Sequence, residues 1–315
     1  MLVYYEFINK QFLEVLEIVL IFFDYENRYF YANCFICYSS SFKTYGNSGM
    51  VLVDNYITIM DNSFDFICFL YPMVNRYWLL LFNWFYMRTL VFGDIHGRLI
   101  WEDIIKKEKD IDKIVFLGDY VTTHESISDE QQLFNFEDIL TYKEDNPEKV
   151  ILLRGNHDLW KFSWGDCTPR PSSWLKKKLL FNFNQFSKLS QWVYIQDNII
   201  FSHAGVSQVW LDNNNLKLED INKQEWSKIF GFTPNRYSDY YGESPTQPPT
   251  WIRPQSLINC AVENYIQVVG HTGVKEISNL HNLDNKYPNI WLCDNLPNQY
   301  LIIEDNNFIV KSCKE

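Results

Sequence analysis

Short apolar runs that stop abruptly at polar loops are the most regular feature of the chain. Each is short enough for one buried strand, and each ends in Asp, Asn or His beside a glycine. Runs of this kind are typical of parallel or mixed sheets, whose strand ends converge on one edge. The pattern predicts a single site that collects these polar side chains. The runs cover residues 91–92, 114–117, 150–153, 199–201 and 268–269.

Segments with apolar residues at helical spacing separate the first runs. They span residues 98–109 and 128–146, and the second has the length of a crossover helix. A further helix is expected over residues 174–189. Alternation of strand and helix predicts an α/β architecture with right-handed crossovers.

Proline, glycine and serine mark the expected loops. Residues 164–171 hold two of the prolines and a glycine, and residues 234–254 are rich in Tyr, Pro, Gly, Ser and Thr. The second stretch is the best candidate for a long loop on the substrate side. Residues 290–292, 300–304 and 308–311 are predicted to form closing antiparallel strands.

Residues 1–86 differ in composition from the rest, because they hold 25 of the 55 aromatic residues and none of the strand-ending loops. Residues 6–25 have the pattern of an amphipathic helix. Residues 64–86 are apolar and aromatic, but polar positions such as Asp65 and Arg76 interrupt every run of about 20 residues, which argues against a membrane span. The first 30 residues carry acidic side chains where a secretory signal needs basic ones.

Two interpretations of this extension are open. One is that Met87 is the true start, since the first strand begins there almost without a leader and the preceding sequence has no clear period. The other is a membrane-binding or partner-binding extension, whose aromatic residues need a lipid or protein surface. We favour the first, and only the second gives the protein a membrane partner.

The net charge limits the kinds of partner that the protein can bind, and the cysteine content indicates its cellular compartment. The net charge is −11, which excludes a broad basic surface for non-specific nucleic acid but leaves room for a local phosphate pocket. Seven cysteines are an odd number with no disulfide framework, and Cys34-x-x-Cys37 lacks the second pair of a zinc finger. A reducing compartment, the cytoplasm, is therefore expected.

The loop after the first run presents Asp94 and His96, two residues apart between Gly93 and Gly97. A carboxylate oxygen and an imidazole nitrogen at that spacing can reach one divalent cation from the end of a strand. The glycines let the backbone turn sharply and approach a phosphate. An Asp-x-His pair alone often occurs by chance, and here it gains specificity from the four loops that follow.

In chain order the five loops are GDIHG, GDY, RGNHD, SHAG and GHT, starting at Gly93, Gly118, Arg154, Ser202 and Gly270. This series resembles the motifs of the calcineurin-like metallophosphoesterases. Its RGNHD and single-His GHT forms are closest to the phosphoprotein phosphatase and dinucleoside tetraphosphatase branches. The resemblance covers residues 87–315 and implies a four-layer α-β-β-α sandwich of mixed sheets, with a dinuclear metal site at the C-terminal ends of the strands.

The resemblance also implies two divalent cations, with a hydroxide between them that attacks phosphorus in line. Oxygen and nitrogen ligands without a thiolate suit manganese, iron or zinc and do not choose among them. The implied ligands are Asp94, His96 and Asp119 for the first cation, and Asn156, His203 and His271, with Asp119 bridging, for the second.

Three further residues acquire roles from the resemblance. In the family, the histidine of the GNH motif protonates the leaving oxygen or stabilises the charge that develops there, so His157 is the candidate general acid. Arg253 lies in a Trp-x-Arg segment similar to the one that supplies a phosphate-binding guanidinium. Arg154 is expected to be structural, supporting its loop.

The chain also departs from the family pattern. Protein phosphatases follow GDY with Val-Asp-Arg-Gly, whereas residues 121–124 are Val-Thr-Thr-His. The carboxylate that orients the catalytic histidine and the arginine that binds phosphate are both missing. Asp158 or another carboxylate is a candidate to orient His157, and His124 is a candidate to replace part of the phosphate contact. Gly273 replaces the second histidine of Gly-His-x-His, which would leave the first cation three protein ligands plus water.

The expected activity is hydrolysis of a phosphoester by a metallophosphatase. Phosphomonoesters, including Ser/Thr phosphoproteins, are the first candidate substrates. Dinucleoside polyphosphates or other nucleotides are the second, favoured by the single-His GHT loop. A non-catalytic binding protein on the same fold is the alternative from a different class, suggested by Thr122 and Thr123.

Overall fold

The structure is a computed structural model. The chain divides into two compact units, Met1–Asn75 and Arg76–Glu315. In the ranges before residue 87 only the strands are described. The described residues are 15–23, 30–38, 43–45, 50–53, 56–58, 87–162, 168–231, 244–282 and 284–314.

Two small antiparallel sheets make up the described part of the first unit. The helix predicted over residues 6–25 is wrong where the structure describes it, because residues 15–23 form a strand. This stretch is rich in β-branched and aromatic residues, which favour a strand, and it pairs with a second stretch of the same kind. The strands are β1 (Val15–Phe23), β2 (Phe30–Tyr38), β3 (Lys43–Tyr45), β4 (Met50–Val53) and β5 (Tyr56–Thr58).

The apolar segment 64–86 lies outside the described residues. None of the helices that the structure does describe combines the length and the apolar character needed to cross a membrane.

The second unit contains a six-stranded mixed sheet in the order β16-β15-β6-β7-β8-β9. Its β6 to β9 are parallel, and β15 runs antiparallel to both β6 and β16. The strands are β6 (Arg88–Phe92), β7 (Lys113–Phe116), β8 (Val150–Leu153), β9 (Ser190–Gln191), β15 (Gln299–Glu304) and β16 (Asn307–Ser312). The helices that connect them are α2 (Ile100–Lys107), α3 (Asp129–Asp145) and α4 (Ser173–Leu189).

A five-stranded mixed sheet follows, in the order β10-β11-β12-β14-β13. Its strands are β10 (Val193–Gln196), β11 (Ile199–Ser202), β12 (Ile266–Val269), β13 (Ser278–Asn279) and β14 (Ile290–Leu292). The remaining helices are α5 (Gln208–Asn213) and α7 (Pro254–Leu257) and the 3-10 turns η1 (His157–Leu159), η2 (Leu218–Lys223), η3 (Lys228–Phe230) and η4 (Leu280–Asn282).

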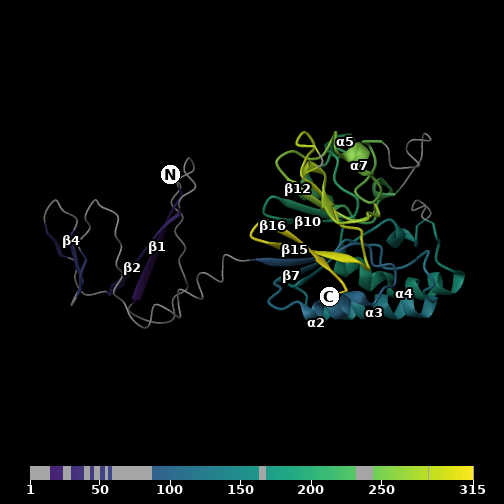
Figure 1. The fold of residues 1–315 in the computed structure, drawn as a ribbon, viewed down its shortest axis with the longest axis horizontal. Coiled ribbons are helices and arrows are strands. Elements are labelled where there is room, and N and C mark those ends of the chain that lie inside the picture. Colours follow the sequence, from purple (N-terminus) through teal and green to yellow (C-terminus); the bar gives the residue numbers. More distant parts are fainter. Residues whose placement is uncertain are drawn as a thin grey trace. The chain divides into compact units, whose positions relative to one another are not determined.

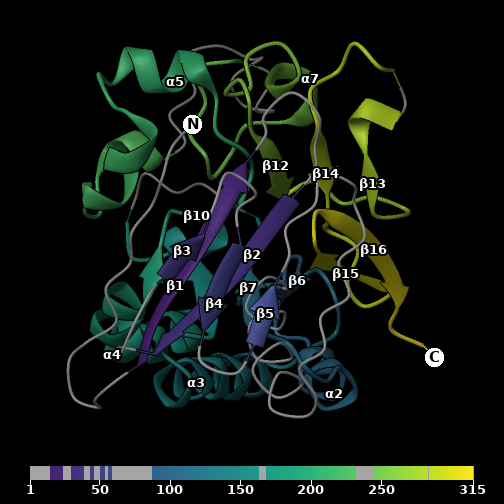
Figure 2. The ribbon, with the colours of Figure 1, turned by 90° about the vertical axis from the view of Figure 1, so that its left-hand side faces the viewer.

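These elements form four layers. In Figure 1, α2, α3 and α4 lie along the outer side of the six-stranded sheet, and α5 and α7 lie beyond the five-stranded sheet. Figure 2 shows the same order of layers after a quarter turn. The predicted α/β sandwich of two mixed sheets is confirmed.

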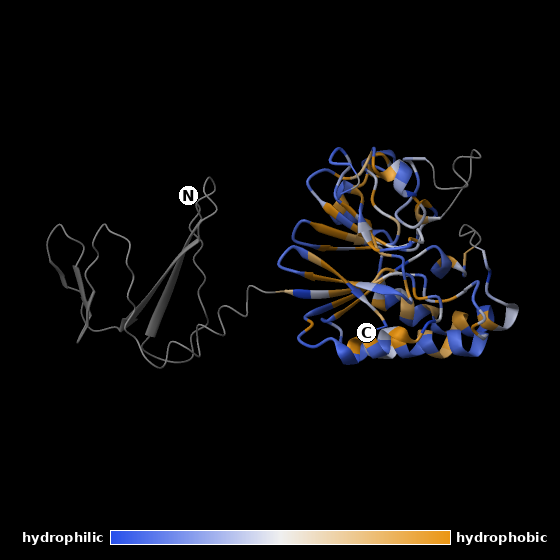
Figure 3. Cartoon of the chain, in the orientation of Figure 1, coloured by the Kyte–Doolittle hydropathy of each residue, from blue (hydrophilic) through white to orange (hydrophobic). Residues whose placement is uncertain are grey.

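Alternate residues of the parallel strands face two different cores. On β6, Leu90 and Phe92 pack with the helices, whereas Val91 belongs to the core between the two sheets. Both faces of the strand are therefore buried, which explains the continuous apolar runs in the sequence. Hydrophobic residues accordingly gather along the strands, as Figure 3 shows.

The three helices predicted after residue 87 match the structure within two residues at their ends. α3 begins just after Ser128, whose hydroxyl accepts a hydrogen bond from the Gln131 amide (3.2 Å) and so caps the helix. Of the predicted loops, residues 168–171 and 244–253 contain neither helix nor strand, and residues 163–167 and 232–243 lie outside the described residues.

The prediction for the C-terminal strands is correct for two of them and wrong for the third. β15 and β16 form the expected antiparallel pair, but β14 belongs to the other sheet, where it runs parallel to β12. Hydrophobic pattern predicts a strand without naming its partner, and here the chain crosses from one sheet to the other after β14.

Candidate dinuclear metal centre

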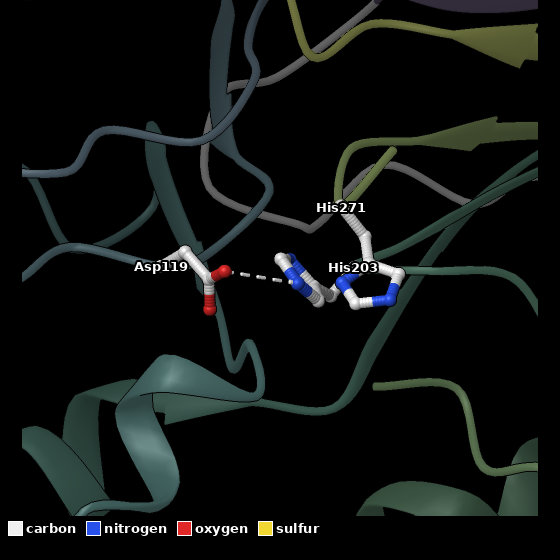
Figure 4. A group of neighbouring side chains, drawn as sticks. All are labelled: Asp119, His203 and His271. Atoms are coloured by element: carbon white, nitrogen blue, oxygen red, sulfur yellow. Dashed lines mark ion pairs between the residues drawn. The ribbon is translucent and has the colours of Figure 1, made fainter. Parts of the chain in front are cut away.

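The six predicted ligands lie in loops that follow strands of both sheets. β6, β7 and β8 lead into the first three loops, and β11 and β12 lead into the other two. Five of the six side chains are buried, and His96 is partly exposed. Figure 4 shows Asp119, His203 and His271 facing one another, although they come from three different loops.

Three ligand residues adopt a left-handed backbone conformation, which non-glycine residues seldom do. The φ angles are 48° at His96, 54° at Asp119 and 62° at His271. Buried hydrogen bonds hold them there. The His96 amide donates to the Asp119 carbonyl (2.7 Å), and the Asp119 amide donates to Asp158 Oδ2 (2.9 Å). Such strain is typical of functional sites in which the surroundings fix the geometry.

Two glycines make room for the carboxylates. A Cβ on Gly155 would lie 2.1 Å from Asp119 Oδ1, and a Cβ on Gly270 would lie 2.3 Å from Asp94 Oδ1. Any side chain at either position would displace a candidate ligand. The glycines of the RGNHD and GHT loops are therefore required by the packing of Asp119 and Asp94.

The ligand atoms fall into two groups that share Asp119. One group is Asp94, His96 and Asp119, and the other is Asp119, His203 and His271. Within each group the ligand atoms lie within 4.8 Å of one another. In the first group, His96 Nε2 is 3.8 Å from Asp94 Oδ2. Two groups with one common carboxylate are the arrangement that a bridged pair of cations requires.

Asn156 joins the second group through His203. His203 Nδ1 donates to the Leu117 carbonyl (2.9 Å), which turns Nε2 toward the site. This nitrogen lies 2.9 Å from Asn156 Oδ1 and 3.3 Å from Asp119 Oδ2. Three ligand atoms from three loops thus converge on one point.

Burial and neighbouring charges shift the pKa values of the candidate ligands. Burial, together with nearby Asp294, raises the pKa of Asp94 well above its usual value. Burial also acts to raise the pKa of Asp119, but the charges of His203 and His157 outweigh it and hold that pKa below the usual range. Burial opposes the protonation of His203, whereas Asp119 and Asp94 raise its pKa to about 10.

The residues present fit a pair of divalent cations. His271 Nε2 and His96 Nδ1 are buried without a hydrogen-bond partner among the described residues. Burial and the neighbouring Arg253 lower the pKa of His271 well below its usual value, so the imidazole is neutral and has a lone pair to offer. Imidazole nitrogens beside buried carboxylates, with no thiolate, form a donor set for a borderline divalent metal, and binding of the metal would displace the proton of His203.

His157 lies beside this centre, at the start of η1. Its ring is 5.1 Å from that of His96, edge to face. Its Nδ1 contacts the hydroxyl of Thr122 rather than a carboxylate. The hypothesis that Asp158 orients it is wrong, because the Asp158 carboxylate accepts the amides of Asp119, Tyr120 and Gly155 instead. Asp158 shapes the backbone of two ligand loops.

The two arginines of the motifs occupy different environments. Arg154 donates to Ser190 Oγ and to the carbonyls of Ser187 and Ser190, and its guanidinium stacks on two tryptophan rings. These contacts confirm a structural role. Arg253 donates to the His271 carbonyl (3.0 Å). Burial lowers the pKa of Arg253, and the nearby carboxylates of Asp94 and Asp119 partly oppose this effect.

His124 is exposed, in the loop between β7 and α3. Burial lowers the pKa of His157, and the nearby His124 adds to this effect, so His124 lies in the neighbourhood of the candidate acid. Its proposed part in phosphate binding stays a prediction, as does that of Arg253.

The sequence prediction missed two residues at the site. Asp294 follows the strand β14, and its Oδ2 lies 3.6 Å from the point where a Cβ on Gly273 would stand, beside the position of the absent second histidine. A signal was present, because Asp294 also ends an apolar run. Thr122, the partner of His157, occupies the place of the missing carboxylate, three residues after Asp119.

Several solved structures and one family model are similar to this chain. Among solved structures, the cold-active protein-tyrosine phosphatase of a psychrophilic Shewanella species is similar, with a TM-score of 0.51 and 19% identity over 72% of this chain and 78% of that chain. A metallophosphoesterase from Sphaerobacter thermophilus has a TM-score of 0.40 and 16% identity over 72% and 88% of the two chains. A serine/threonine phosphatase from Saccharomyces cerevisiae has a TM-score of 0.43 and 13% identity over 72% and 79%.

At these identities the structural likeness shows the fold alone. No curated protein sequence matches the chain. The model of one family, described as calcineurin-like phosphoesterase, matches residues 87–296, which is more than half of the chain. The family match and the shared ligand loops together assign the activity class, a metal-dependent hydrolase of phosphoesters. The chain belongs to the calcineurin-like phosphoesterase family.

Proposed function

We propose that the protein is a phosphomonoesterase that uses two divalent cations, with manganese as the first candidate. The observation that carries the proposal is the pair of ligand groups sharing Asp119, with His157 at their side. Cations bound there would polarise the phosphoryl oxygens and lower the pKa of the attacking water. The protein supplies the remaining chemistry.

His157 and Arg253 are the residues assigned to the substrate. As the bond from phosphorus to the leaving oxygen breaks and the bond from the water oxygen forms, His157 donates a proton from Nε2 to the leaving oxygen. Arg253 is anchored by the His271 carbonyl and by Thr272 Oγ1 (3.1 Å), which leaves the rest of its guanidinium to bind phosphoryl oxygens. His124, which is exposed, is proposed to add part of the phosphate contact.

One observation favours a second substrate class, the dinucleoside polyphosphates or other nucleotides. The partner of His157 Nδ1 is an uncharged hydroxyl, which stabilises an imidazolium less than a carboxylate would. A phosphate leaving group, with a second pKa of about 6, needs less protonation than the alkoxide of serine or threonine. The leaving group of an aryl phosphate, a phenol with a pKa of about 10, has an intermediate need for protonation.

Substrate class is tested by steady-state kinetics of the full chain with added Mn²⁺. The panel is phosphoserine and phosphotyrosine peptides, p-nitrophenyl phosphate and diadenosine tetraphosphate. Monoester turnover that exceeds tetraphosphate turnover supports the proposal, and the reverse order overturns it in favour of nucleotides. His157→Ala lowers kcat about 100-fold or more. His281→Ala, at a histidine in η4 that belongs to none of the five loops, serves as the matched control.

The compartment is part of the same proposal. Cys260, Cys293 and Cys313 are free thiols, which suits a reducing environment. We propose the cytoplasm.

A further inference from the structure

The hydroxyl of Thr122 sets the hydrogen-bond pattern of His157. Thr122 Oγ1 donates its only proton to the Val121 carbonyl (2.6 Å), so toward His157 Nδ1 it can act only as an acceptor. Nδ1 must therefore carry the hydrogen. The position of the hydrogen on one ring nitrogen decides the state of the other, and Nε2 is left to exchange protons with a substrate.

Thr122 is itself held in an unusual conformation. Its φ angle is 63°, which is rare for a β-branched residue. Its amide donates to Gln132 Oε1 (2.7 Å), and the other end of that buried amide side chain donates to the Ile127 carbonyl (3.0 Å). Gln132, on α3, thus clamps the Thr122 backbone. A strained residue that the surrounding structure fixes so firmly calls for a functional explanation.

The described residues offer His157 no alternative partner of the usual kind. Asp119 Oδ1 accepts the backbone amide of His157 (2.8 Å) and does not reach the ring nitrogen as a hydrogen-bond partner. Asp158 is committed to three backbone amides. Among the described residues, Thr122 Oγ1 is the only hydrogen-bond partner of the His157 imidazole.

We propose that Thr122 is the positioning residue of the reaction, a neutral hydroxyl that keeps hydrogen on Nδ1 and directs Nε2 of His157 at the leaving oxygen. The inference rests on the proposed function, in which His157 gives a proton from Nε2 and returns to the neutral ring with Nδ1–H retained. Thr122 belongs to neither of the two ligand groups, so its role is to act through His157.

Kinetics of three variants of the full chain with Mn²⁺ test this role. Thr122→Ser keeps the hydroxyl, Thr122→Val removes it at similar shape, and Thr122→Gly removes it while accepting the positive φ without strain. With phenyl phosphate we expect the Val and Gly variants to lose about 10- to 100-fold in kcat at an unchanged KM, and the Ser variant to stay within about threefold. With p-nitrophenyl phosphate, whose leaving group needs less protonation, the loss is smaller.

Two results would overturn the role of Thr122. One is an equal loss for both substrates in the Val and Gly variants, and the other is a Ser variant as impaired as they are. The double variant of His157→Ala with Thr122→Val gives a further check, since residues that act as a unit cause no additional loss. A loss that multiplies in the double variant also contradicts the proposal.

A spectroscopic measurement separates this inference from the proposed function. In metal-free protein, ¹⁵N NMR of the His157 ring reports which nitrogen carries the hydrogen, with His157→Ala used to assign the signals. We expect the Nδ1–H form in the wild type and in Thr122→Ser, and a mixture of the two forms in Thr122→Gly. An unchanged ring signal in Thr122→Gly overturns the inference even if the protein hydrolyses phosphoesters. Absence of turnover on every phosphoester, with the expected ring signals, overturns the proposed function and with it the role of Thr122 in the reaction.

Discussion

Asp94 and His271 are 177 residues apart in the chain, yet Asp94 Oδ1 accepts a hydrogen bond of 2.9 Å from the His271 amide. The bond joins the loop after β6, in the six-stranded sheet, to the loop after β12, in the five-stranded sheet. It fixes one predicted ligand of each cation relative to the other. The metal centre is therefore also a junction between the two sheets, and ligand variants will affect stability as well as activity.

Asp94→Asn should stabilise the metal-free protein while abolishing its response to metal. The amide oxygen can still accept the His271 hydrogen bond, but the buried charge is gone. Because folding raises the pKa of Asp94, the ionised carboxylate destabilises the metal-free protein progressively as the pH rises above the unfolded-state pKa of about 3.9. We expect a gain of about 1–2 kcal/mol at pH 7, measured by urea unfolding with a chelator present. A less stable variant under those conditions would contradict the electrostatic account.

Gly155→Ala should disrupt the centre, whereas Gly273→Ala should not. The new methyl at residue 155 meets Asp119 Oδ1 at 2.1 Å, while at residue 273 the nearest atom is 3.6 Å away, an ordinary contact. We expect the first variant to lose at least tenfold in manganese affinity by calorimetry and the second to stay close to wild type. Equal affinities would show that the loop after β8 adapts without moving the shared carboxylate.

Arg154→Ala should cost stability, and Arg253→Ala should cost activity. The first change leaves the carbonyls of Ser187 and Ser190 without their donor and removes the stacking on Trp192 and Trp226. A loss of about 3 kcal/mol in unfolding free energy is expected. Arg253→Ala should raise KM for phosphoesters, with a smaller loss of stability than Arg154→Ala because it leaves one carbonyl, that of His271, without its donor. A stable Arg154→Ala enzyme with a raised KM would reverse the assignment of the two arginines.

Glu108→Gln should destabilise the protein at neutral pH and lose this effect in acid. Burial opposes ionisation of Glu108, but hydrogen bonds from Lys311 (2.8 Å) and Tyr300 (2.7 Å) and the ion pair with Arg88 lower its pKa below the usual value. A depressed carboxylate pKa stabilises the fold above the unfolded-state pKa of about 4.3, and the gain disappears as the pH falls through the folded-state pKa.

The measurement is unfolding free energy at pH 7 and at successively lower pH. We expect a difference of about 1–3 kcal/mol at pH 7 that shrinks steadily below pH 4. The control is Glu102→Gln, since Glu102 makes only an exposed pair with Lys106 and the change should stay within about 0.5 kcal/mol. A difference for Glu108→Gln that does not vary with pH would assign the effect to packing.

Much of the fold and of the ligand set could be predicted because both depend on local pattern. Apolar runs buried on both faces fixed the parallel strands, and the residues that end them lie together because the strand ends do. Contacts between residues that are distant in the sequence were harder to predict. The contact between Thr122 and His157 depends on a left-handed backbone and on Gln132 in a later helix, which no spacing rule describes.

Two other errors have similar causes. β14 was placed correctly along the chain but not in its sheet, and with it the position of Asp294 beside Gly273 was missed. Residues 15–23 satisfied a helical period while their β-branched and aromatic content favoured the strand that forms. Periodicity predicts the kind of element well only where composition agrees with it.

Turnover of p-nitrophenyl phosphate by the full chain, after chelation and again after addition of Mn²⁺, tests the central claim most directly. The measurement includes Asp119→Asn, which removes the charge shared by the two ligand groups. The account predicts no turnover without metal, turnover with Mn²⁺, and at least a 100-fold loss in the variant. A folded, metal-loaded wild-type protein that does not turn over, or an Asp119→Asn variant as active as wild type, would contradict it.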